Sequence, residues 1–180
     1  MTQKNTPTTY GRIAQALHWI STLLILTLLF MGLYMTHQAE GAFQAKLYQS
    51  HTTIGFILSF LTLLRVIWIL FDARPAIPVG MSKGRQFIFR GVHVVLYLFL
   101  FLLAFSGIGM LLLSGVTLPP IGLTPDAINH ELVPVAVHDI GSKFYILFFL
   151  AHIGGVISYQ LTKSDVLSRM GIPWFTKKNN

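Results

Sequence analysis

The sequence predicts an all-α integral membrane protein, a four-helix transmembrane bundle. Of its 180 residues, 53% are hydrophobic and only 11% are charged, a composition typical of membrane proteins. The apolar residues form four runs, each near the about 20 residues that cross a hydrocarbon core. Because a backbone in lipid must satisfy its own hydrogen bonds, and these runs are too long for barrel strands, we expect helices.

We expect one domain over residues 1–180, with the first span retained and not removed as a signal peptide. The apolar runs and the Pro and Gly residues between them predict helices at about 12–36, 48–71, 84–113 and 135–163. Residues 1–11 are polar, and we expect them to fray. The connection at 114–134 is expected to hold a short helix near 126–132.

The positive charges predict the orientation in the membrane. Eleven fall at one membrane side, namely Lys4, Arg12, Arg65, Arg74, Lys83, Arg85, Arg90, Lys163, Arg169, Lys177 and Lys178. Only Lys46 and Lys143 fall at the other. Since cytoplasmic loops carry the excess of Lys and Arg, both termini are expected to be cytoplasmic. This topology signal explains the net charge of +7 without a nucleic-acid partner.

The chain contains no cysteine. This absence excludes disulfides, iron–sulfur clusters, thiolate ligation of haem and covalent haem attachment. It also excludes a quinone-linked disulfide oxidase.

Histidines within the spans are the candidate site. His138 and His152 are fourteen residues apart, so they leave one face of one helix about 21 Å apart. From the topology, His51 lies at the depth of His138 near the outer side, and His18 at that of His152 in the cytoplasmic half. The histidines therefore form two pairs, each joining two helices.

A haem held by two histidines requires such depth-matched imidazoles, with small residues nearby to admit a flat porphyrin. The nearby small residues include Ala14 and Ser21 for His18, Gly55 for His51, Gly141 and Ser142 for His138, and Gly154 and Gly155 for His152. Ordinary hydrogen bonds between helices remain an alternative for any single histidine. Zinc or copper fits less well, because each pair supplies two ligands only.

Other polar residues have secondary roles in this interpretation. His93 has bulky neighbours, so it is a candidate for a quinone or haem-propionate contact or a structural hydrogen bond, and not for an axial ligand. His37 competes with His51 for the outer site, but fits the helix geometry less well. Four arginines near the inner side, Arg12, Arg65, Arg85 and Arg90, are candidates for propionate contacts or simply reflect the topology.

Several segments together resemble the bacterial cytochrome b561 family, which is related to the haem b subunits of membrane formate dehydrogenases and nickel–iron hydrogenases. They are YGRIAQALHW at 10–19, HTTIG at 51–55, LLRVIW at 63–68, GVHVVLYLFLFLLAFSG at 91–107, the helix with HDIG and AHIGG, and DVLSRM at 165–170. The resemblance implies two b haems, with His18 and His152 on the inner iron and His51 and His138 on the outer one.

The resemblance also implies electron transfer to or from a quinone pool, with ubiquinone as the expected acceptor. It leaves open a superoxide:ubiquinone oxidoreductase, an acceptor of electrons from an outer redox protein, and a membrane subunit of a larger dehydrogenase or hydrogenase complex. The outer side carries Lys46 and Lys143 against Glu40, Asp126, Glu131 and Asp139, a balance of −2. This charge does not favour capture of an anion such as superoxide.

Overall fold

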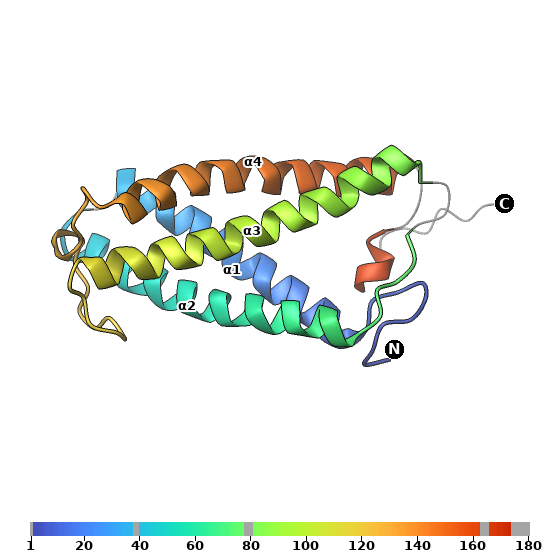
Figure 1. The fold of residues 1–180 in the computed structure, drawn as a ribbon, viewed down its shortest axis with the longest axis horizontal. Coiled ribbons are helices and arrows are strands. Elements are labelled where there is room, and N and C mark those ends of the chain that lie inside the picture. Colours follow the sequence, from blue (N-terminus) through green and yellow to red (C-terminus); the bar gives the residue numbers. More distant parts are fainter. Residues whose placement is uncertain (1, 38–39, 78–80, 163–165, 174–180) are drawn as a thin grey trace.

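The computed structural model describes residues 2–37, 40–77, 81–162 and 166–173. Its order of elements is α1 (Arg12–His37), α2 (Gly41–Phe71), α3 (Lys83–Leu113), η1 (Pro125–Ala127), α4 (Val133–Thr162) and η2 (Ser168–Met170). Figure 1 shows the four long helices side by side, with the chain running alternately up and down the bundle. All four are long and apolar enough to cross a membrane, as predicted.

Helix α2 differs most from its predicted bounds, because it begins at Gly41 and not near residue 48. The preceding Glu40 is extended, and Gly41 has a positive φ of 58°. No proline follows until Pro75, so the polar segment 41–50 continues the apolar helix outward. At 31 residues, α2 is about 46 Å long, which exceeds a hydrocarbon core of about 30 Å.

The helices form two hairpins. Helix α1 packs along α2, and α3 packs along α4, whereas α2 and α3 make fewer close approaches and α1 and α4 fewer still. The large apolar side chains that point away from the bundle, such as Phe30, Leu70 and Leu161, are exposed. In a four-helix membrane protein, this apolar surface faces lipid.

An apolar layer crosses the middle of the bundle. It contains Ile25 of α1, Leu58 of α2, and Tyr145 and Phe149 of α4, all buried. Tyr145 is the most enclosed of the four, with 2% of its surface exposed. The layer lies between the level of His138 and that of His152 on α4, so it separates the two histidine levels.

The expectation that residues 1–11 fray is wrong for the part the structure describes. The backbone N–H of Asn5 donates to Asp72 Oδ2 at 3.0 Å, and that of Tyr10 donates to the carbonyl of Arg169 at 3.0 Å. Arg169 in turn donates through Nε to the carbonyl of Thr8 at 2.8 Å. Polar residues here stay ordered because two distant chain segments supply their hydrogen-bond partners.

The segment after α4 packs on the start of α1. The indole N–H of Trp19 donates to the carbonyl of Met170 at 2.8 Å. Gly171 has φ +82°, and a Cβ there would overlap the side chain of Gln15, so glycine is required for this close approach. Three of the predicted inner cations, Lys163, Lys177 and Lys178, lie outside the described residues.

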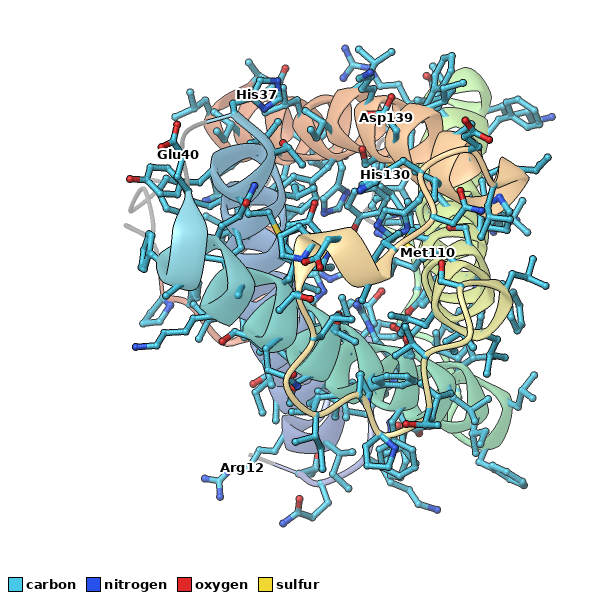
Figure 2. The ribbon with its side chains drawn as sticks, turned by 90° about the vertical axis from the view of Figure 1, so that its left-hand side faces the viewer. Arg12, His37, Glu40, Met110, His130 and Asp139 are labelled. Carbon is cyan, nitrogen blue, oxygen red and sulfur yellow. The ribbon has the colours of Figure 1, made fainter. Side chains whose placement is uncertain are left out.

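The connection between α3 and α4 lies across the end of the bundle that is predicted to be outer (Figure 2). Gln49 of α2 holds it, donating through Nε2 to the carbonyl of Pro120 and accepting from the Leu123 N–H at 3.0 Å. Leu123 and Ile128 are buried against Leu111 of α3. The short helix predicted near 126–132 is a single turn, η1, that begins at Pro125.

Candidate functional site

His51 of α2 and His138 of α4 face each other at the predicted outer end. Their ring centres are 6.3 Å apart and the rings are inclined by 72°. The two residues come from different hairpins, so the space between their rings lies between the two hairpins. This is the outer pair that the sequence predicts.

A cavity of about 500 Å³ surrounds the two rings. All four long helices and the α3–α4 connection line it, and most of the lining is aliphatic or aromatic. Cofactor pockets typically have volumes of about 300–1,000 Å³ and an apolar lining with few polar groups. The cavity therefore has the size and chemistry of a cofactor site.

The ring of His138 is held by α3. Its Nδ1 lies 3.1 Å from the carbonyl oxygen of Leu103 and 3.1 Å from Ser106 Oγ. Because a carbonyl only accepts, Nδ1 carries the proton, and the lone pair is on Nε2. Histidines that bind metals are commonly oriented in this way, by a hydrogen bond from the other ring nitrogen. Ser106 was not identified from the sequence.

Two glycines back the histidine rings, and both come from the neighbouring helix of the same hairpin. A Cβ on Gly32 of α1 would lie 3.5 Å from His51 Cε1, and one on Gly107 of α3 would lie 3.6 Å from His138 Cε1. A methyl group would just touch each ring, and any larger side chain would occupy its place.

These glycines differ from the small residues chosen from sequence. A Cβ on Gly55, Gly154 or Gly155 would meet nothing within 4 Å, and one on Gly141 would contact leucines of α3. Spacing along one helix identifies its own small residues, but not those that a neighbouring helix brings to the ring.

The outer pair fits a group that binds through two imidazoles. A metal bonded to two opposed ring nitrogens at about 2 Å places the two ring centres about 6 Å apart, which agrees with the 6.3 Å observed. His51 Nδ1 is also buried without a hydrogen-bond partner in the described part of the chain. An apolar cavity with one imidazole held for ligation suits an iron porphyrin.

The inner histidines are arranged differently. The rings of His93 (α3) and His152 (α4) are 5.0 Å apart at 84°, closer than two ligands on opposite sides of one iron. His93 Nδ1 donates to the carbonyl of Phe89 at 2.6 Å. The structure therefore places His93, which was predicted to make a secondary contact, directly beside the predicted ligand His152.

Arg65 of α2 reaches into the bundle and donates from Nη2 to His18 Nδ1 at 2.7 Å. Its guanidinium also lies 5.4 Å from the centre of the Tyr97 ring, a cation–π contact. While His18 accepts at Nδ1, its proton is on Nε2, so an iron at Nε2 requires Arg65 to release the ring. The inner site thus fits an axial ligand only after this hydrogen bond changes.

The remaining predicted residues are more exposed. Arg12 begins α1, while Arg85 and Arg90 lie in the first part of α3, and all three are exposed. His37 is exposed at the end of α1, with Nδ1 bonded to the carbonyl of Leu33 at 3.0 Å. It lines the cavity without replacing His51 opposite His138. Among the described residues, no three His, Asp or Glu side chains converge as a protein-held zinc ion needs.

Comparison with known proteins places these features in a family. Residues 9–171 match the family described as prokaryotic cytochrome b561. A relative described as "Cytochrome b561 homolog 2", from Escherichia coli (strain K12), is 32% identical over 108 residues. That alignment covers 59% of this chain and 57% of the relative, so the chain spans little more than half of that protein's length in the match.

Proposed function

Because the chain belongs to the prokaryotic cytochrome b561 family, a family of membrane b-type cytochromes that transfer electrons, we propose a more specific role. The protein is a di-haem cytochrome of the bacterial inner membrane that relays single electrons between a donor on the outer side and the quinone pool. The observation that carries this proposal is the His51–His138 pair, whose ring centres are 6.3 Å apart in an apolar cavity.

At the outer site, His51 and His138 would hold a b haem through their imidazoles. A haem held by two histidines would supply single-electron transfer there, with no free position for oxygen. The Leu103 carbonyl and Ser106 keep the proton of His138 on Nδ1. The apolar layer at Ile25, Leu58, Tyr145 and Phe149 keeps water from crossing the bundle beneath this site.

At the inner site, His18 and His152 would hold the haem, as the family resemblance implies, and Arg65, which donates to His18 Nδ1 in the structure, would pair with a haem propionate. A guanidinium pairs well with a carboxylate because its N–H groups match the two oxygens. The exposed Arg12 and Arg90 are further propionate candidates. His93, in contact with His152, takes the secondary position at this site.

The positive-inside rule orients the molecule. Seven of the predicted inner cations lie at the end of the bundle that carries the described termini, namely Lys4, Arg12, Arg74, Lys83, Arg85, Arg90 and Arg169. Arg65 lies in the last part of α2, toward the same end. This end is cytoplasmic in the proposal, and His51 and His138 are near the outer surface.

The charge of the outer end favours a donor other than superoxide. Among the six charged residues there, Lys143 is already paired with Asp139 at 2.8 Å. Glu40, Asp126 and Glu131 are exposed, with Lys46 as the remaining cation. This net negative surface repels an approaching anion and does not steer it toward the outer site. We therefore propose that the donor on this side is uncharged or cationic, such as a redox protein.

The test is an optical spectrum of the purified protein, followed by reaction with ubiquinone-1. We expect reducible b-type bands, two haems per chain, and reoxidation of the reduced haems by the quinone. A colourless protein, or haems that the quinone does not reoxidise, would contradict the proposal.

A further inference from the structure

The connection between α3 and α4 turns apolar side chains away from the protein. Residues 114–125 of this connection contain no charged side chain. Ile121 is 90% exposed and Leu118 is 41% exposed. Pro120 and Leu123, in contrast, are buried. The backbone is therefore held against the bundle while the side chain of Ile121 projects outward.

The hydrogen bonds of Gln49 give the depth of this segment. The apolar stretch of α2, residues 51–71, is about 31 Å long and matches a hydrocarbon core of about 30 Å. Gln49 precedes this stretch, so it lies about 3 Å beyond the hydrocarbon boundary. Because Gln49 donates to the carbonyl of Pro120 and accepts from the Leu123 N–H, residues 120–123 lie near the same level.

The end of α3 gives a second indication of depth. Helix α3 is apolar up to its last residue, Leu113, and both Leu112 and Leu113 are exposed. No charged residue lies between Arg90 and Asp126, so none separates the membrane span from the connection. In Figure 1, the connection (yellow) leaves the end of α3 and lies beside α2. It therefore stays close to the membrane.

The backbone of the segment suits the headgroup region of a bilayer. Irregular backbone avoids the hydrocarbon core, because its N–H and C=O groups need partners there. The headgroup region holds water and begins where the core ends. Pro119 and Pro120 have no N–H, and the Leu123 N–H is bonded to Gln49 at 3.0 Å. The segment therefore requires little hydration of its N–H groups at this depth.

Lipid headgroups surround the bundle at this level, so they cover the segment before a soluble protein can. We infer that the segment 117–122 inserts Leu118 and Ile121 into the headgroup region of the bilayer. Apolar side chains in this region stabilise membrane attachment through the area that they bury. The contact anchors the α3–α4 connection, whose Leu123 and Ile128 line the cavity at the outer pair. It holds whichever side of the membrane this end faces, and it does not depend on the proposed electron transfer.

Single nitroxide labels test the depth of Ile121. The chain has no cysteine, so each single-cysteine variant reports one position. Phe60→Cys is the lipid reference, because Phe60 is 61% exposed near the middle of the apolar stretch of α2. Ala42→Cys is the water reference, because Ala42 is exposed in the first turn of α2, about 10 Å further outward than Gln49.

The labelled proteins are reconstituted in phosphatidylcholine nanodiscs. Power saturation then measures the collisions of each label with oxygen, which concentrates in lipid, and with a nickel chelate, which stays in water. We expect the ratio of oxygen to nickel collisions at Ile121→Cys to be several-fold above that at Ala42→Cys and below that at Phe60→Cys. Because Ile121 is exposed, its substitution should not disturb the fold.

An equal ratio at Ile121→Cys and Ala42→Cys would overturn the inference. Spin–spin broadening at Ile121→Cys that disappears on dilution with unlabelled protein would also overturn it, because a second copy of the chain would then cover the segment. Haem content and reoxidation by quinone are separate measurements, so either result would leave the proposed function standing.

Discussion

The two ends of the bundle hold their histidines in different ways. At the outer end, His51 and His138 face each other across a cavity, and a glycine of the neighbouring helix backs each ring. At the inner end, His18 is bonded to Arg65, and His152 lies against His93. Backbone groups position the rings at the outer end, whereas contacts between side chains position the rings at the inner end.

This difference has consequences for how the two sites respond to change. A ring that is held by a backbone carbonyl and backed by glycine depends on the helix positions, which the packed hairpins fix. The orientation of a ring that is hydrogen-bonded to an arginine depends on the position of the guanidinium group. We therefore expect the outer site to be sensitive to side-chain volume and the inner site to be sensitive to charge.

Removing one ligand from each end should have the largest effect. His138→Ala and His152→Ala should each reduce the haem content from two to about one per chain, because an iron with one protein nitrogen is held far more weakly. The pyridine haemochrome assay measures this content. Two haems retained in either variant would contradict the assignment of that ligand.

Volume at the outer site should have the next largest effect. In Gly107→Leu, the new side chain takes the place of the His138 ring, so the outer haem should be lost or become high-spin, while the inner haem remains. Gly84→Leu is the control, since Gly84 is exposed with open space around it. Low-spin spectra for both haems in Gly107→Leu would show that the ring is not held as described.

Charge at the inner site should produce a smaller, measurable shift. Arg65→Met removes a cation beside His18. Because the loss of a nearby positive charge favours the ferric state, the midpoint potential of the inner haem should fall by about 50 mV. This shift is close to a tenfold change in a one-electron equilibrium. The outer haem should change much less. Lys83→Met removes an exposed cation from the same end, and an equal shift in that variant would mean that only net charge matters.

The smallest expected effect concerns the hydrogen bonds of His138. Ser106→Ala removes one of two acceptors near Nδ1 and leaves the Leu103 carbonyl. Haem affinity at the outer site should therefore fall by about tenfold or less, the lower end of the range for residues that orient metal ligands. Haem transfer to apomyoglobin measures this affinity. A complete loss of the outer haem would show that Ser106, and not the carbonyl, orients the ring.

Much of this arrangement follows from the sequence for identifiable reasons. Runs of apolar residues long enough to cross a bilayer predict transmembrane helices. Because successive helices cross the membrane in alternating directions, their order predicts which residues lie at equal depth. This reasoning brought His51 and His138 to the same level, and the structure places their ring centres 6.3 Å apart, with the rings inclined by 72°.

What could not be predicted depends on contacts across helices. Gly32 and Gly107 touch the rings only because α1 and α3 have particular rotations about their axes, which a single sequence does not reveal. The inward reach of Arg65 was likewise hidden, because a long side chain near a helix end can turn either toward the surface or into the bundle. The ordered N-terminal residues depend on Asp72 and Arg169, which lie far away in the chain.

Electron paramagnetic resonance of the oxidised protein tests the central claim most directly, because each bis-histidine ferric haem gives its own low-spin signal. We predict two such signals in the wild type, with His51→Ala removing one and His152→Ala removing the other. Loss of the same signal in both variants, or a wild type without low-spin signals, would contradict two separate haem sites at the two levels of the bundle.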